Sequence, residues 1–221
     1  TYTTNNYAVI TYDWAGTYAG TRSYPTDKIT LYPSALSRLN QVVNPGADDV
    51  HQSSVTNAST LKTMDMYYWT AMAKRVLSYF RTIPDVNSNK IGFWGYSWGG
   101  TIAWNMCTDE RLKAIVAYYG NGWIHYWRTN GVYKYPMPPF NPTTFSEGNN
   151  RYISALEPQS YAKRAKVPIL WLGGTNDYHG RLDWGLDNFD LMSPSLSGSF
   201  AFEANQAHNA QVNTVQDDLL W

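Results

Sequence analysis

Apolar residues recur at steps of three and four between Thr63 and Arg81, which predicts a long amphipathic helix. Four short apolar runs bounded by turn residues follow it, and each predicts a strand: Lys90–Gly95, Lys113–Tyr119, Val167–Leu172 and Ser199–Glu203. Helices are expected between them, at Gly99–Thr108 and around Asp183–Leu191. Strands that alternate with helices predict an α/β fold, with a mostly parallel sheet and helices on both faces.

The remaining segments complete a single expected domain over residues 1–221. The apolar run Tyr7–Tyr12 predicts a further buried strand, and the tail from Asn209 to Trp221 predicts a helix. Residues near 16–60 and 120–160 lack periodicity and contain several prolines, so both are expected to be irregular insertions. A chain of 221 residues is long enough for one domain with a sizeable core and too short for two ordinary ones.

Charge and hydropathy narrow the classes of partner. The chain has 17 basic and 17 acidic residues, so its surface has no electrostatic signature for nucleic acid or anionic lipid. It also has no apolar run of the length that a membrane span needs. We therefore expect neither nucleic acid nor membrane as a partner. The low fraction of charged residues, 15%, slightly favours a secreted or periplasmic protein.

Aromatic residues make up 16% of the chain, with 18 Tyr and 10 Trp. They are expected either to fill the core and large loops or to line a carbohydrate cleft, and composition leaves both open. Cys107 is the single cysteine, which excludes an internal disulfide. Because it lies in a predicted helix, we expect a buried, inert thiol rather than a reactive one.

The strongest chemical signal is Gly95-Tyr96-Ser97-Trp98-Gly99, which lies between a predicted strand and a predicted helix. Such a sharp strand-to-helix turn pushes the hydroxyl of Ser97 out above the sheet as a nucleophile. Glycine at both flanking positions, Gly95 and Gly99, is expected to let neighbouring elements pass closely. The N–H of Trp98, at the start of the helix, would face the oxyanion that forms during attack on a carbonyl. A simple Gly-rich turn is the alternative.

A serine hydroxyl needs a base, and behind such a turn the acid and then the base follow in chain order. Three histidines follow Ser97: His125, His179 and His208. His125 comes before the next strand, and His179 is too close to Asp177 to be oriented by that carboxylate. His208 lies between the last strand and the terminal helix, so we predict it as the base. A solvated loop histidine is the alternative.

Asp177 is the predicted acid, because it lies in the loop directly after the strand Val167–Leu172. Its rivals fall on a predicted helix and are expected to face solvent: Asp183, Asp187 and Asp190. A metal site formed by Asp177, His179 and Asp183 is an alternative. Two carboxylates and one imidazole without a thiolate favour it only weakly. We therefore expect no metal and no organic cofactor.

The residues at this point resemble a known group. Four segments are similar to the acetyl xylan esterase, dienelactone hydrolase and prolyl-oligopeptidase-like branch of the α/β-hydrolases: Leu77–Gly92, Gly95–Gly100, Asp109–Val116 and Val167–Asp177. The resemblance covers roughly residues 7–209 apart from the two insertions. It implies an α/β-hydrolase fold, with Ser97 as nucleophile, Asp177 as acid, His208 as base and the N–H of Trp98 as one oxyanion donor.

The resemblance also implies that Tyr7–Tyr12 follows a strand whose His-Gly loop supplies the second oxyanion donor. The chain begins at Thr1 without Met, and this sequence does not include that strand and loop. We therefore expect an N-terminally truncated chain that lacks the first strands. Loss of one oxyanion donor costs about 10²–10³ in rate. The exposed edge of the sheet is also expected to lower solubility.

Together these features predict a serine carboxylic-ester hydrolase that acts through an acyl-enzyme on a small-molecule or carbohydrate ester, such as an acetylated plant polysaccharide. Aromatic residues of the second insertion are expected to form a lid or substrate wall, with ordinary core packing as the alternative: Trp123, His125, Trp127, Tyr133 and Tyr135. Two other functions stay open. A prolyl-oligopeptidase-like peptidase would share the same three residues, and a catalytically silent carbohydrate-binding protein would keep only the fold.

Overall fold

A computed structural model describes residues 7–12, 65–121, 154–177 and 182–208. Within these residues the chain forms a four-stranded sheet of order β1-β2-β3-β4. The strands are β1 (Gly92–Tyr96), β2 (Ala114–Tyr118), β3 (Ile169–Gly174) and β4 (Gly198–Glu203). Each pair of neighbours is parallel, and the registers place Gly92 beside Ala114, Ile115 beside Ile169, and Ile169 beside Gly198. All four predicted strands of this part of the chain are confirmed.

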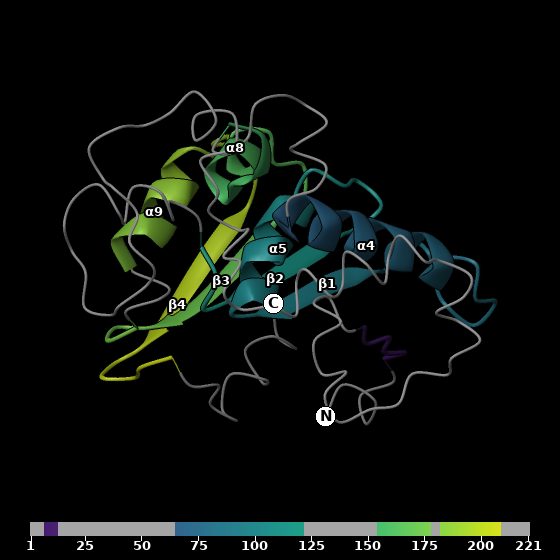
Figure 1. Ribbon diagram of the computed structural model, residues 1–221, viewed down its shortest axis with the longest axis horizontal. Coiled ribbons are helices and arrows are strands. Elements are labelled where there is room, and N and C mark those ends of the chain that lie inside the picture. Colours follow the sequence, from purple (N-terminus) through teal and green to yellow (C-terminus); the bar gives the residue numbers. More distant parts are fainter. Residues whose placement is uncertain (1–6, 13–64, 122–153, 178–181, 209–221) are drawn as a thin grey trace.

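Four described helices accompany the sheet: α4 (Asp65–Phe80), α5 (Trp98–Met106), α8 (Pro158–Ala162) and α9 (Leu182–Asp190). Figure 1 shows them on one side of the strands, with α4 and α5 over β1 and β2. The parallel sheet with interleaved helices confirms the predicted α/β class. Among the described residues, no helix is both long and apolar enough to cross a membrane. Most of both insertions and the predicted C-terminal helix lie outside the described residues.

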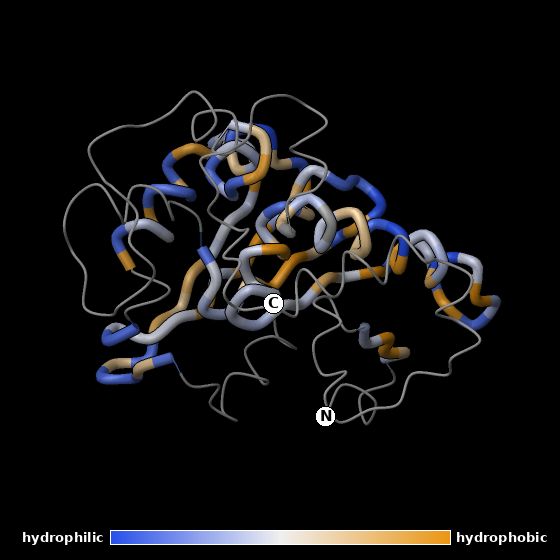
Figure 2. Tube along the Cα trace, viewed as in Figure 1, coloured by the Kyte–Doolittle hydropathy of each residue, from blue (hydrophilic) through white to orange (hydrophobic). Residues whose placement is uncertain are grey.

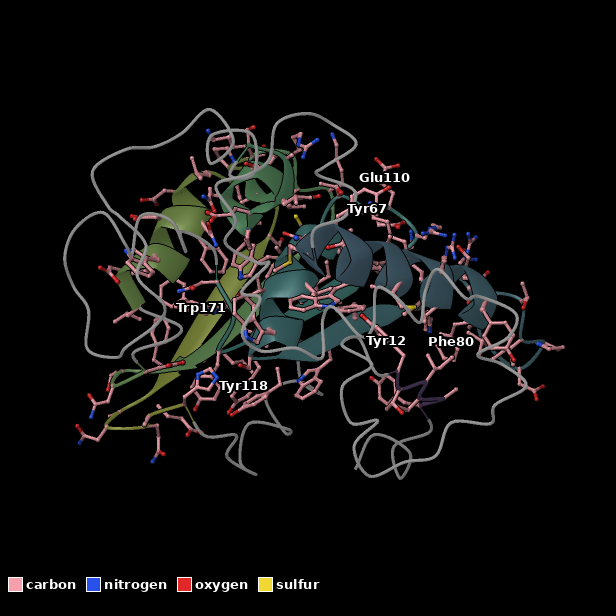
Figure 3. The ribbon with its side chains drawn as sticks, viewed as in Figure 1. Tyr12, Tyr67, Phe80, Glu110, Tyr118 and Trp171 are labelled. Atoms are coloured by element: carbon pink, nitrogen blue, oxygen red, sulfur yellow. The ribbon has the colours of Figure 1, made fainter. Side chains whose placement is uncertain are left out.

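The two central strands are apolar on both faces, which explains why they appear in the sequence as unbroken apolar runs. Every residue of β3 is buried. Alternate positions such as Ile169 and Trp171 belong to the main core beneath the helices. The positions between them, such as Leu170 and Leu172, form a second cluster on the other face together with Val116, Tyr118 and Tyr119. In Figure 3, Tyr118 lies below the sheet, away from the helices.

The main core fills the space between the helices and the sheet. The buried face of α4 has the three- and four-residue spacing that predicted the helix: Met66, Trp69, Ala73 and Leu77. All residues of α5 from Gly100 to Met106 are buried. Figure 2 shows hydrophobic positions concentrated where α5 lies over the strands. Cys107 is fully buried, and this burial raises the pKa of its thiol to about 12. The expected burial of this thiol is confirmed.

The predicted buried strand at Tyr7–Tyr12 is wrong. The segment forms no strand, and Tyr7 and Val9 are 51% and 50% exposed. Tyr12 is partly buried and packs against the main core, as does Phe80 at the end of α4. In Figure 3, Tyr12 lies below this helix. A strand is stabilised by pairing with a neighbour, which β-favouring composition alone does not provide. Residues 7–12 pair with none of the four described strands.

Candidate active site

Ser97 occupies the sharp turn that the sequence predicted. β1 ends at Tyr96 and α5 begins at Trp98, so one residue makes the whole connection. Ser97 has φ 56° and ψ −119°, a backbone conformation that side-chain-bearing residues rarely adopt. Its N–H donates to the Tyr118 carbonyl at the end of β2 (2.7 Å), and its carbonyl accepts from the N–H of Thr101 (3.0 Å). The surrounding strand and helix thus hold the strained residue in place.

The close approach at this turn depends on Gly95 and Gly100. A Cβ on Gly95 would overlap the main chain of Gly99, and a Cβ on Gly100 would lie 2.5 Å from the Tyr118 carbonyl oxygen. A Cβ on Gly99 would meet nothing within 4 Å. The expectation for Gly95 is confirmed, whereas that for Gly99 is wrong. The helix crosses the end of β2 at Gly100, and Gly99 faces open space.

We therefore expect the three glycines to respond differently to alanine. Gly95→Ala and Gly100→Ala should lower the free energy of unfolding by about 1–3 kcal/mol, because backbone atoms would have to move. Gly99→Ala should leave it unchanged or raise it by up to about 1 kcal/mol, since alanine favours the helix. Urea denaturation of the three variants measures the difference. Equal losses at all three positions would contradict the packing described above.

Three predicted residues meet at the carboxyl ends of the parallel strands, the edge where α/β proteins bind ligands. Ser97 follows β1, Asp177 lies shortly after β3, and His208 lies shortly after β4. The Nε2 atom of His208 is 2.7 Å from the Oγ of Ser97. Its Nδ1 atom is 2.8 Å from the Oδ2 of Asp177. The structure thus brings the predicted nucleophile, base and acid into one hydrogen-bonded chain.

Burial and charge suit these three hydrogen-bonded side chains to proton transfer. The side chain of Asp177 is 0% exposed and that of His208 is 17% exposed. With the carboxylate accepting from Nδ1–H, Nε2 is left as an acceptor for the Ser97 hydroxyl. The rival carboxylates are exposed on α9, as predicted: Asp183, Asp187 and Asp190. Of the described acidic residues weighed for this role, Asp177 is the one in contact with His208.

Hydrogen bonds donated by main-chain N–H groups set the distance between acid and base. The Asn176 N–H donates to the Gln206 carbonyl (2.9 Å), and the Asn205 N–H donates to the Thr175 hydroxyl (2.8 Å). A Cβ on Gly174 would overlap the same Gln206 carbonyl. The loop that carries Asp177 and the loop that carries His208 therefore lie in close contact, and their backbones set the relative positions of these two residues.

Gly120, which follows Tyr119, packs against the start of α5 and accepts hydrogen bonds from two tryptophan side chains. The carbonyl of Gly120 accepts hydrogen bonds from two buried indoles, Trp104 Nε1 at 3.1 Å and Trp171 Nε1 at 3.0 Å. A Cβ on Gly120 would overlap the main chain of Thr101, one turn into α5. Sequence reasoning missed this anchor. The available signal was the glycine directly after a buried strand, but nothing in the sequence paired it with two distant tryptophans.

Two tyrosine rings lie against the imidazole, and sequence reasoning missed both. The ring centroids of Tyr96 and Tyr119 are 5.6 and 5.2 Å from that of His208. Tyr119 has φ 56° and is almost fully buried. Burial, with Tyr118 and the nearby carboxylates of Glu203 and Asp177, raises the pKa of Tyr119 above its ordinary value. Tyr96 belongs to the motif Gly95–Gly99, but the motif does not show which face of the sheet the ring covers.

Of the other predicted site residues, the structure describes Trp98 but not the substrate wall. Trp98 is the first residue of α5, and its ring packs on Trp69 with centroids 5.9 Å apart. The expected substrate wall, Trp123, Trp127 and Tyr133, lies outside the described residues, as do His125, Tyr135 and His179. In the described part of the chain, no group of three His, Cys, Asp or Glu side chains could hold a metal ion.

Comparison with known proteins identifies the family of this chain. Residues 41–184 match the dienelactone hydrolase family. This match covers more than half of the chain and includes Ser97 and Asp177. No curated protein sequence is significantly similar to the chain.

Solved structures with the same fold include two acetyl xylan esterases. The enzyme from Paenibacillus sp. R4 has a TM-score of 0.62 at 14% identity, over 72% of this chain and 53% of that one. Acetyl xylan esterase 1 from Thermoanaerobacterium sp. JW/SL YS485 has a TM-score of 0.55 at 12% identity, over 75% and 54%. Uncomplexed acylaminoacyl peptidase from Pyrococcus horikoshii has a TM-score of 0.52 at 21% identity, over 68% and 24%. The chain thus spans about half the length of these esterases and about a quarter of the peptidase. At these identities the likeness shows an α/β-hydrolase fold.

Proposed function

This chain belongs to the dienelactone hydrolase family, and from that premise we propose that it is a serine carboxylic-ester hydrolase. The observation that carries the proposal is the hydrogen-bonded chain from the Oγ of Ser97 through His208 to the buried carboxylate of Asp177. A serine hydroxyl bonded to an imidazole, which a carboxylate orients in turn, is the arrangement that activates serine for attack on acyl groups.

In the proposed reaction, Nε2 of His208 accepts the Ser97 proton while Oγ attacks the carbonyl carbon of the ester. Asp177 holds the imidazole in the required tautomer and stabilises its charged form. The N–H of Trp98, at the positive end of α5, stabilises the oxyanion of the tetrahedral intermediate. The intermediate collapses as His208 gives its proton to the departing alkoxide. Water then attacks the acyl-enzyme with His208 again as base, which releases the acid and restores Ser97.

We propose a carbohydrate ester or a small ester as the substrate. A lactone is a cyclic carboxylic ester, so the family's name points to the same bond type. Two of the solved structures that share this fold are acetyl xylan esterases. The high aromatic content, 16%, supplies flat apolar rings of the kind that stack on sugars. In this proposal Trp123, Trp127 and Tyr133 form part of the wall that contacts the sugar.

A substrate panel tests the proposal. The full chain is incubated with p-nitrophenyl acetate, acetylated xylan and a peptide p-nitroanilide, alongside the Ser97→Ala variant. We expect release of acetate from the first two substrates, dependent on Ser97, and no cleavage of the anilide. Efficient cleavage of the anilide would favour a peptidase instead. Binding to xylan without turnover of any ester would indicate a silent carbohydrate-binding protein.

A further inference from the structure

Tyr96 links the two strands that carry the nucleophile and the base. It is the last residue of β1, directly before Ser97, and its ring packs in the second cluster, on the face of the sheet away from the main core. β1 and β4 are the two outer strands of the described sheet, and β2 and β3 lie between them. His208, which follows β4, must therefore reach back across the sheet to meet Ser97.

The side chain of Tyr96 makes two contacts with His208. Its hydroxyl donates a hydrogen bond to the main-chain carbonyl of His208 (3.0 Å). Its ring lies 5.6 Å from the imidazole, at an interplanar angle of 44°. Tyr119 supports the ring of Tyr96 edge-on at 5.7 Å, so the phenol is held on a second side. The hydroxyl thus fixes the backbone of His208 while the ring bounds the tilt of its imidazole.

The hydrogen bond from Tyr96 holds a residue that the other hydrogen bonds of the loop carrying His208 do not hold. The hydrogen bonds to the loop that carries Asp177 involve Asn205 and Gln206, and they set how closely the two loops approach each other. The bond from Tyr96 fixes residue 208 itself, and it comes from the neighbour of Ser97 in the chain. A displacement of about 1 Å between reacting groups can cost about 10²-fold in rate. The hydrogen bond between Tyr96 and the carbonyl of His208 therefore controls the distance between Nε2 of His208 and Oγ of Ser97, across which the proton is transferred.

We propose that Tyr96 is a positioning residue, whose hydroxyl holds His208 at hydrogen-bonding distance from Ser97. The inference rests on the proposed function and names a residue that acts on the same site through His208. Tyr96 acts through its hydroxyl and ring contacts with His208. Its removal should therefore slow activation of Ser97 and leave substrate affinity unchanged.

A double-mutant cycle on the full chain tests this inference. The rate of Ser97 phosphonylation by a fluorophosphonate is measured for the wild type, Tyr96→Phe, His208→Ala and the double variant. Tyr96→Phe should slow labelling about 5-fold, as expected for loss of one hydrogen bond. In the His208→Ala background the same substitution should change the rate less than about 2-fold, because the imidazole that the hydrogen bond positions is absent. Equal slowing in both backgrounds would overturn the proposal, as would no slowing in the wild type.

Two further measurements keep the result interpretable. Tyr79→Phe, at an exposed position of α4, is the matched control and should label at the wild-type rate. Proton NMR of the ring N–H between His208 Nδ1 and Asp177 needs no turnover, and this proton should exchange faster with water in Tyr96→Phe. If Ser97 is not labelled in the wild type, the proposed function fails while the exchange rate still tests Tyr96. An unchanged exchange rate would then overturn the positioning role.

Discussion

Ser97→Ala is expected to lower ester turnover by on the order of 10⁴–10⁶-fold, as found when a serine that acts as a unit with its base is removed. The substitution deletes one oxygen atom, which lies 2.7 Å from His208. Without it, no acyl-enzyme forms, and His208 and Asp177 have no nucleophile to activate. Because the main chain at residue 97 is held by hydrogen bonds to Tyr118 and Thr101, the turn should keep its shape.

The control for this variant is Ser195→Ala, in the exposed turn that follows α9. It removes the same atom far from His208 and should leave turnover unchanged. Steady-state hydrolysis of p-nitrophenyl acetate measures both variants, and circular dichroism confirms that each is folded. Turnover in Ser97→Ala within 10-fold of the wild type would show that Ser97 is not the nucleophile.

Asp177→Asn is expected to lower turnover by about 10⁴-fold, the loss seen when the acid of such a triad is replaced by its amide. The carboxylate of Asp177 is fully buried and accepts from Nδ1 of His208 at 2.8 Å. An amide can present N–H in its place, which favours the tautomer with a proton on Nε2. That nitrogen would then face Ser97 as a donor and could no longer accept its proton. The substrate KM should change little, because the amide has nearly the shape of the carboxyl group.

Asp187→Asn is the matched control for the acid. Asp187 was a rival for the role in the sequence and is exposed on α9. Partial desolvation and the neighbouring Asp183 and Asp190 raise the pKa of its carboxyl, so the amide relieves repulsion between like charges. Turnover should stay at the wild-type level. A larger loss in Asp187→Asn than in Asp177→Asn would mean that the acid has been misassigned.

The described core of the fold could be predicted because each element has its own periodicity. The buried positions of α4 follow the helical repeat, and β2 and β3 are apolar on both faces. The meeting of Ser97, Asp177 and His208 in one hydrogen-bonded arrangement could also be predicted, because the proposed chemistry requires a fixed order of residue types after particular strands. These predictions rest on local patterns together with the connectivity of the sheet.

Features that depend on partners distant in the sequence could not be predicted in the same way. Tyr7–Tyr12 has the composition of a strand, but whether it pairs depends on a neighbour that its own sequence does not specify. Gly100, rather than Gly99, makes the close approach because the helix crosses the end of β2 there. The contact between Tyr96 and His208 joins residues far apart in the sequence and depends on which face of β1 the ring covers.

The most direct test of the proposed function is to map where a fluorophosphonate modifies the intact chain. Mass spectrometry of the digested protein identifies the residue, and the labelling rate is compared between the wild type and His208→Ala. We predict one adduct, on Ser97, formed at least about 10²-fold more slowly when the general base is removed. An adduct on another residue, or labelling of Ser97 at the same rate without His208, would contradict the proposed function.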